Sequence, residues 1–270
     1  MPLFNLTNKT AVITGGAGIL GKGFSRELAK NGAKVAVADV CFEKAEQVCH
    51  SILEEFPDAK VLPLRCDVTD TINIARMVET VKIQFNSIDI LLNNAATKTD
   101  NLHKFFASFE EYDLETWRKV MSVNLDGMFL VAQAVSKEMI KQNTGGSIIQ
   151  TSSIYGVVAP DQSIYKGSEY LGVEINTPAV YSASKGAVLS LTKYLATYLA
   201  KYSIRVNTLT PGGIESGQNN TFIKNYSSKV PLGRMGKFDE LLGALVFLAS
   251  DASTYVTGQN IIVDGGFTCW

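Results

Sequence analysis

Tyr181 and Lys185 stand four residues apart in a segment with helical periodicity, so both side chains lie on one face of the expected helix. A free phenol has a pKa near ~10, too high for ready proton exchange at neutral pH. An ammonium group beside it favours the phenolate, lowers the pKa of the tyrosine and makes it a usable general acid or base. Because the same spacing also occurs on solvated helix faces, the pair alone does not indicate proton transfer. The rest of the chain has to supply that evidence.

A glycine-rich turn lies near the start of the chain. Residues 9–14 form a short apolar run, and positions 20, 24 and 28 are apolar at helical spacing. Between them stands the run Gly15-Gly16-Ala17-Gly18-Ile19-Leu20-Gly21. A strand, a glycine turn and a helix in this order are typical of a dinucleotide site, because glycines let the backbone approach a pyrophosphate at the helix N-terminus. The alternative is a turn that merely connects two elements.

Asp39 ends the next apolar segment, 18 residues after Gly21. A dinucleotide-binding fold places at this point an acid that accepts hydrogen bonds from the adenosine ribose. A carboxylate there repels a 2′-phosphate, and no arginine stands beside Asp39 in the sequence, so we expect NAD to be preferred over NADP. The alternative is a strand-end aspartate that caps the helix expected near Glu43.

Strand and helix patterns alternate along the whole chain, which predicts a parallel sheet covered by helices on both faces. We expect strands at 9–14, 33–38, 60–65, 87–92, 147–150, 204–209 and 260–263, and helices at 72–85, 114–141 (interrupted at 124–127) and 239–250. Segments 97–113, 157–178 and 212–232 lack a clear period and are expected to be loops, the last two a substrate-loop insertion and a substrate lid. With no repeat or linker, residues 1–270 are expected to form a single domain.

Composition narrows the function classes. The chain has 270 residues, of which 46% are hydrophobic and 19% charged, with a net charge of −1, so we expect neither nucleic acid nor an anionic membrane as a partner. The N-terminus lacks the features of a signal peptide and no apolar run could cross a bilayer, which predicts a cytoplasmic protein. Four cysteines without zinc spacing and only two histidines argue for reduced thiols and against a metal site.

Further short motifs occur along the chain in a fixed order. They are Thr14-Gly15…Gly21, Asp67-Val68, Asn93-Asn94-Ala95-Ala96, Asn124, Ser153, Tyr181-x-x-x-Lys185, Pro211-Gly212 and the closing segment 256–266. In this combination the sequence resembles the short-chain dehydrogenase/reductase family over essentially its whole length. The resemblance implies a Rossmann-type, doubly wound α/β fold with about seven parallel strands. It also implies an NAD(P)-dependent oxidoreductase that acts on CH–OH groups of a small molecule and forms a homo-oligomer, a tetramer or a dimer.

The resemblance assigns roles to four catalytic residues. Tyr181 would give or take the proton of the alcohol, and Lys185 would lower its pKa and hold the nicotinamide ribose. Ser153 would bind the substrate oxygen, where charge develops as hydride moves, and Asn124 would hold a water that passes protons to Lys185. The implied cofactor contacts are Gly15, Gly18, Ile19, Leu20, Gly21, Asp39, Asp67, Val68, Asn94, Ala95, Tyr181, Lys185, Pro211, Gly212, Ile214 and Ser216.

The chain departs from the family pattern at several places. Ile19 and Ala96 stand where glycines are usual, and Ser216 replaces a commoner threonine. Ser153 and Tyr181 are 28 residues apart, much further than usual, so we expect an insertion beside the site that shapes substrate access.

The composition of the loops suggests a substrate class. Segments 160–170 and 214–230 are rich in hydrogen-bonding side chains, whereas steroid or fatty substrates need apolar walls. We therefore expect a sugar, a polyol or a sugar derivative, and a role in carbohydrate metabolism. The glycine turn and the insertion also resemble, more weakly, a bacterial branch linked to surface-glycan and flagellin-sugar synthesis.

Two other functions stay open at this point. An epimerase or dehydratase could use the same Tyr-Lys pair, although such relatives usually carry a longer C-terminal substrate domain. A non-catalytic NAD-binding sensor or scaffold is the other alternative, although such proteins tend to have lost the tyrosine, the lysine or the serine that this chain keeps.

Overall fold

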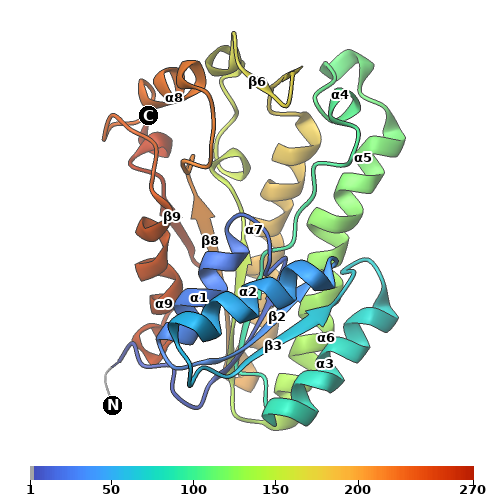
Figure 1. Ribbon diagram of the computed structural model, residues 1–270, viewed down its shortest axis with the longest axis vertical. Coiled ribbons are helices and arrows are strands. Elements are labelled where there is room, and N and C mark those ends of the chain that lie inside the picture. The colour runs from blue at the N-terminus through green and yellow to red at the C-terminus, as the bar shows by residue number, and fades with distance from the viewer. Residues whose placement is uncertain (1–2) are drawn as a thin grey trace.

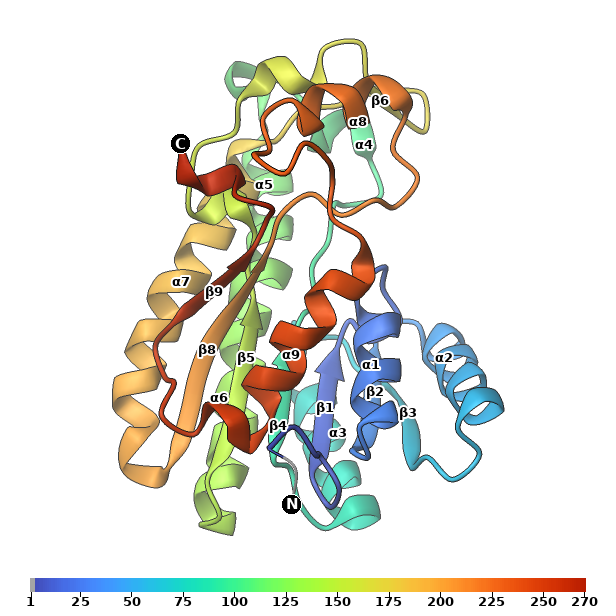
Figure 2. The same cartoon turned by 90° about the vertical axis from the view of Figure 1, so that its left-hand side faces the viewer.

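Seven parallel strands form the centre of the molecule, in the order β3-β2-β1-β4-β5-β8-β9 (Figures 1 and 2). The computed structural model describes residues 3–270. The strands are β1 (Thr10–Thr14), β2 (Lys34–Asp39), β3 (Val61–Arg65), β4 (Ile90–Asn93), β5 (Gly146–Thr151), β8 (Ile204–Pro211) and β9 (Asn260–Val263). The strand order reverses between β1 and β4, and in open α/β sheets ligands bind beyond the carboxyl ends of the strands at such a point.

Helices cover both faces of the sheet (Figure 2). They are α1 (Gly21–Lys30), α2 (Phe42–Glu55), α3 (Thr71–Phe85), α5 (Leu114–Met121), α6 (Met128–Gln142), α7 (Ala179–Leu199) and α9 (Leu242–Ala249). Strand side chains alternate between two buried clusters: Val12 and Leu91 pack with α3, α6 and α7, whereas Ile13 and Leu92 pack with α1, α2 and α9. This two-sided burial explains why the strands read as continuous apolar runs.

The predicted strands are all present, and the predicted fold class is confirmed. The interruption expected at 124–127 is a π-helical turn, Ser122–Gly127, between α5 and α6. The prediction of a loop over 97–113 is wrong in part, because this segment contains the short helix α4 (Leu102–Phe105) and a 3-10 turn at Phe109–Glu111. One turn of helix is too short to leave a period in the sequence.

The insertion and the predicted lid pack against each other above the carboxyl ends of the strands (Figures 1 and 2). The insertion holds a 3-10 turn and a small hairpin, β6 (Glu169–Tyr170) and β7 (Val173–Glu174), while the lid segment contains α8 (Asn220–Ser227). Asn225 of α8 donates a hydrogen bond to the carbonyl of Ile164 at 3.1 Å. Lys229 and Asp161 add an ion pair at 2.9 Å.

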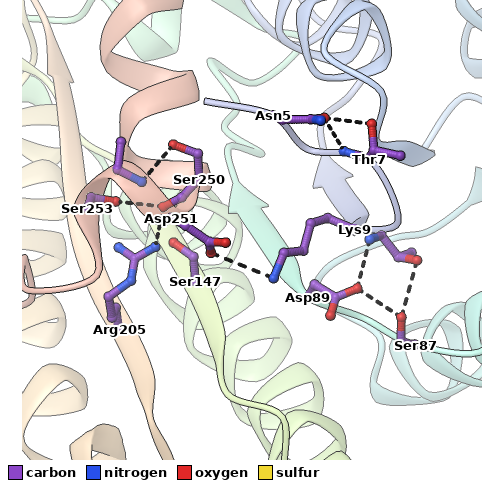
Figure 3. A network of polar contacts seen from close by, with 12 residues as sticks. Asn5, Thr7, Lys9, Ser87, Asp89, Ser147, Arg205, Ser250, Asp251 and Ser253 are labelled. Carbon is purple, nitrogen blue, oxygen red and sulfur yellow. Dashed lines mark hydrogen bonds and ion pairs between the residues drawn. The ribbon is translucent and has the colours of Figure 1, made fainter. Parts of the chain in front are cut away.

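A polar network lies at the opposite end of the sheet, where the strands begin (Figure 3). Arg205 on β8 donates to the carbonyls of Leu248 and Ser250 at 3.0 and 3.2 Å, which ties the end of α9 to the sheet. The backbone N–H of Thr10 donates to Asp89 at 2.8 Å and joins β1 to β4. Because each of these side chains bonds a backbone group nearby, we conclude that the network stabilises the fold and is not a functional site. Within residues 3–270, no helix is long and apolar enough to span a membrane.

Candidate active site

The first two turns of α7 present Tyr181 and Lys185 to the end of β5. The two side chains share one face of the helix, as the spacing predicts, with the Lys185 Nζ 5.9 Å from the centroid of the Tyr181 ring. Lys185 is buried, and its Nζ donates to the carbonyl of Thr151 at 3.0 Å. The ammonium therefore faces a backbone carbonyl and the phenol ring together.

Burial dominates the electrostatics of this pair. It raises the pKa of Tyr181, and a hydrogen bond with Ser153 partly opposes the effect by lowering it. Burial also lowers the pKa of Lys185 to about 8. In the chain by itself, loss of solvation therefore sets the direction of the Tyr181 pKa, and the lowering of this pKa by Lys185 stays a prediction.

Ser153 follows β5 directly and is held beside α7 by its neighbours. It precedes a 3-10 turn, Ile154–Gly156, and its Oγ accepts a hydrogen bond from the Tyr155 N–H at 3.3 Å. A Cβ on Gly156 would lie 2.6 Å from the carbonyl of Lys185, so only glycine allows this approach to the helix. The Ser152 hydroxyl donates to the same carbonyl at 2.8 Å. This second contact, which motif reasoning missed, helps to bring Ser153 next to Tyr181.

Asn124 lies fully buried in the π-helical turn between α5 and α6. Its Oδ1 accepts a hydrogen bond from the Thr97 N–H at 2.9 Å, while its Nδ2 has no partner among the residues that the structure describes. A buried donor without a partner is costly and marks a place where a water or a ligand group belongs. The π-helical turn is a common device at functional sites, because it turns a side chain out of the regular helical register.

The glycine turn between β1 and α1 forms a close cradle. Gly15 has a φ of +59°, and a Cβ there would lie 2.9 Å from the Cα of Ala95. A Cβ on Gly21 would overlap the carbonyl oxygen of Gly15. Gly18 donates its N–H to that same oxygen at 3.1 Å, whereas the side chain of Ile19 is 61% exposed. The replacement at position 19 therefore points into solvent, and the turn keeps its shape.

Asp39 holds this cradle from the end of β2. One carboxylate oxygen accepts from the Ala17 N–H at 3.1 Å and the other from the Cys41 N–H at 3.1 Å. No arginine stands beside Asp39 in the sequence, but strand pairing brings one next to it, because Arg65 is its register partner on β3. The two residues are far apart in the sequence, and only the pairing of the strands makes them neighbours.

The remaining predicted cofactor residues lie at the same edge of the sheet. Asn94 donates its side-chain amide to the carbonyl of Gly15 at 3.3 Å, and Ala95 packs against the glycine turn. Asp67 accepts from the Thr69 N–H at 2.9 Å, and buried Val68 sits where a side chain on Gly127 would clash. The family usually has a glycine after Ala95. Here the residue is Ala96, which is exposed.

The residues after β8 form the far side of this edge. Pro211 ends β8, and Gly212 lies within contact of Asp264. Ile214 bridges to Gly236 and packs partly on the buried cluster of α1 and α9. Ser216 is exposed, and its Oγ accepts from Gln218 at 3.0 Å.

A cavity of about 300 Å³ opens between α7, the insertion, the lid and the 97–113 segment. Ser153 and Tyr181 lie in its wall, together with Phe105, Phe106, Ile154, Tyr155, Tyr165, Phe222, Tyr226, Asn176, Gln218 and Lys98. The charged side chains of the insertion, such as Asp161 and Lys166, do not line it. The expectation that the polarity of the insertion gives the polarity of the pocket is therefore wrong in this detail, because aromatic side chains point inward and charged ones outward.

A sequence profile described as "short chain dehydrogenase" matches residues 9–227, which is most of the chain. The chain belongs to the short-chain dehydrogenase/reductase family. It is thus an oxidoreductase that acts on CH–OH groups with a nicotinamide cofactor. Other members of this family resemble the chain over nearly their whole length.

Three relatives illustrate the likeness. D-arabinitol 2-dehydrogenase [ribulose-forming] of Candida tropicalis is 33% identical, with 100% of this chain and 96% of the relative covered. A gluconate 5-dehydrogenase from Burkholderia cenocepacia, solved with NADP and tartrate, has a TM-score of 0.86 at 33% identity and covers 99% and 98% of the two chains. A short-chain dehydrogenase from Leptospira borgpetersenii with bound NAD+ has a TM-score of 0.83 at 35% identity and covers 97% and 93%.

The residues of this short-chain dehydrogenase fit such a cofactor. The cradle at Gly15 and Gly21 admits no side chain, and it opens onto the N-terminus of the ten-residue helix α1, whose free N–H groups suit a pyrophosphate. Within residues 3–270, no group of three His, Cys, Asp or Glu side chains could hold a metal ion.

The lowered pKa of Lys185 predicts a pH-dependent stability. Between the pKa of about 8 in the folded chain and the ordinary value of ~10.4, the unfolded chain binds a proton that the folded chain does not, so stability rises with pH. The unfolding free energy of the wild type minus that of Lys185→Met should rise by about 2 kcal/mol from pH 8 to pH 10 in urea titrations. The same substitution at exposed Lys193 of α7 is the matched control. A difference that stays flat over this range would contradict the prediction.

Proposed function

We propose that this enzyme transfers hydride between NAD and the carbon of a secondary alcohol in a polyhydroxylated small molecule: a sugar, a polyol or a sugar derivative. One observation carries the proposal. The cavity that holds Ser153 and Tyr181 also contains a buried acceptor without a partner, the Oδ1 of Asn176, among tyrosine hydroxyls. A site with such groups favours a substrate that brings several hydroxyls of its own.

Four side chains carry the chemistry in this proposal, and the nicotinamide, when bound, accepts or supplies the hydride. Ser153 donates a hydrogen bond to the substrate oxygen and holds it near the phenol of Tyr181, which lies in the wall of the same cavity. Tyr181 takes or returns the alcohol proton as general base or acid. Lys185 places its ammonium group on the same side of the site as the phenol of Tyr181. The Nδ2 of Asn124, which has no partner in the described chain, holds a water that exchanges protons with Lys185.

The walls of the cavity suit a sugar-like chain. Tyr165 shares a hydrogen bond with Thr177 at 2.5 Å and donates another to Tyr155 at 3.3 Å, so its hydroxyl is fixed in place. Asn176 is fixed in turn by a hydrogen bond from its Nδ2 to the carbonyl of Phe106 at 2.6 Å, which leaves its Oδ1 free for a ligand. Aromatic faces pack against the C–H groups of a polyol, and the fixed polar atoms read its hydroxyls.

The names of two of the relatives agree with this substrate class. D-arabinitol 2-dehydrogenase and gluconate 5-dehydrogenase are named for polyhydroxylated substrates, and the chain covers both almost completely. An epimerase remains the alternative, because it would use the same Tyr-Lys pair and return its hydride to the substrate. The weaker resemblance to a surface-glycan branch stays a prediction.

The preference for NAD rests on Asp39. Its carboxylate lies at the end of β2 beside the glycine cradle, where it would bond a ribose and repel a 2′-phosphate. Arg65 stands next to Asp39, and its positive charge would attract a 2′-phosphate. The two side chains therefore have opposite effects on the choice between NAD and NADP. We infer that Asp39 prevails, because hydrogen bonds from Ala17 and Cys41 fix it at the cradle while Arg65 is exposed.

We also infer the setting of the enzyme. The four cysteines are free thiols, which suits the reducing cytoplasm. A stacked pair of exposed tyrosines, Tyr194 and Tyr198, lies on the outer face of α7 and suits burial in a dimer or tetramer. Segments 157–178 and 212–232 act as substrate insertion and lid, since both contribute walls to the cavity.

Replacing the phenol tests the chemistry. Tyr181→Phe should lower kcat by about 10²–10⁴-fold, because the general acid and base is lost, while the affinity for NADH stays close to that of the wild type. Steady-state rates and NADH fluorescence titration measure the two quantities. Tyr255→Phe, at a fully exposed tyrosine outside the cavity, is the matched control. Turnover near the wild-type level in Tyr181→Phe would discard the mechanism.

A substrate panel tests the proposed class. We expect net NADH formation with polyols such as xylitol and little with steroids or acyl thioesters. Asn176→Ala should lower the ratio of kcat/KM for xylitol to that for cyclohexanol about tenfold, because the single alcohol does not need the Oδ1 acceptor. An equal loss for both substrates would show that Asn176 only supports the fold. Product without net NADH would favour the epimerase.

Substitutions of Asp39 and Arg65 test the preference for NAD over NADP. In the wild type kcat/KM should be higher with NAD than with NADP, and Asp39→Ala should lower the ratio about tenfold or more by removing the repulsive charge. Asp39→Asn, which keeps an acceptor for the Ala17 N–H, separates the charge from the shape of the turn. Arg65→Met in the Asp39→Ala background should remove the gain with NADP. A wild type that already prefers NADP would refute the assignment.

A further inference from the structure

Lys98 stands out among the side chains that line the substrate cavity. It is the one residue with a formal charge at neutral pH in a wall otherwise made of aromatic, aliphatic, glycine, proline, hydroxyl and amide groups within the described chain. It forms neither an ion pair nor a side-chain hydrogen bond with any residue from 3 to 270. The proposed mechanism does not use it.

The ammonium of Lys98 is held in a defined place. Its Nζ lies 4.2 Å from the centroid of the Tyr170 ring, which belongs to the β6–β7 hairpin of the insertion. Although Lys98 is an exposed residue as a whole, burial of the ammonium lowers its pKa. A cation over an aromatic face is stabilised, but a ring does not replace a counter-ion.

The backbone around Lys98 is anchored to the catalytic region. The N–H of Thr97 donates to Asn124 at 2.9 Å, and the N–H of Thr99 donates to the Thr97 hydroxyl at 3.2 Å. Thr99 has a φ of +69°, a left-handed conformation that is unusual for a β-branched residue. Such strain persists where the surrounding structure fixes the chain, and it is common at ligand sites.

The acidic residues of the hairpin do not neutralise Lys98. Glu169 and Glu174 pair across the hairpin, as do Tyr170 and Val173. Because successive residues of a strand point to opposite faces, the two glutamates lie on the face away from the Tyr170 ring and the ammonium. The charge of Lys98 is therefore left for a ligand.

We propose that Lys98 makes the enzyme selective for hydroxylated substrates that carry an anionic group, such as a sugar acid, by pairing with a carboxylate while Ser153 and Tyr181 hold the reacting hydroxyl. This inference rests on the proposed function and narrows its substrate class. A cavity of about 300 Å³ accommodates a molecule of sugar size, so one ligand can contact both groups. Arg or Lys is the natural partner for such an anion, and a partly desolvated pair is stronger than one in water.

A matched pair of probes tests the inference. D-gluconate and D-glucitol have carbon chains of equal length, and they differ at one end by a carboxylate in place of a hydroxymethyl group. Lys98→Met should lower the ratio of kcat/KM for gluconate to that for glucitol about tenfold, and Lys98→Arg should restore most of it. Added salt should weaken gluconate binding in the wild type and have a smaller effect in Lys98→Met. Lys166→Met, at an exposed lysine of the insertion outside the cavity, is the control.

Calorimetric binding of gluconate to the enzyme–NADH complex separates this inference from the proposed function. If neither probe gives net NADH, the proposed function fails, and loss of gluconate binding in Lys98→Met would still support anion recognition by this lysine. Unchanged gluconate affinity in Lys98→Met, or equal losses for both probes, would overturn the inference. So would a loss confined to NADH affinity, because the charge would then belong to the cofactor site.

Discussion

The close approach of the end of β5 to α7 is the contact on which the site depends. Gly156 allows the backbone to reach the carbonyl of Lys185, Ser152 bonds that carbonyl, and the ammonium of Lys185 returns a bond to Thr151. These contacts join the same two elements from both sides and need nothing from the chain between them. An insertion between Ser153 and Tyr181 can therefore grow without moving Tyr181 and Lys185 away from the end of β5, although Ser153 and Tyr181 are 28 residues apart.

Burial gives this arrangement its electrostatic character. The pKa of the phenol rises and the pKa of the ammonium falls, because a poorly solvated site penalises each charged form alone. Phenolate and ammonium formed together offset each other far better than either does alone. In the proposed mechanism the pair is suited to proton transfer that is coupled to charge development in a bound ligand, with Ser153 beside Tyr181 in the cavity wall.

Much of this structure could be predicted from the sequence, and the failures have physical causes. Strands buried on both faces leave apolar runs, and the glycine turn and the Tyr-Lys spacing are local patterns, so both were found. Arg65 becomes a neighbour of Asp39 only through strand register, and α4 is too short to show a period. The Ser152 contact to the Lys185 carbonyl is a tertiary contact between distant segments, which no local motif records.

The polarity of the cavity does not follow from the composition of the insertion, for a reason that also shows how the fold accommodates specificity. Composition does not say which side chains point inward: Asp161 faces Lys229, while Ile164 and Tyr165 join Phe222 in a separate apolar cluster above the sheet. Since this cluster contributes nothing to the two clusters that hold the sheet and its helices, its side chains can change without loss of the core. Under the proposed function, the strand ends therefore fix the chemistry, and the insertion and lid, which pack on one another, set the choice of substrate.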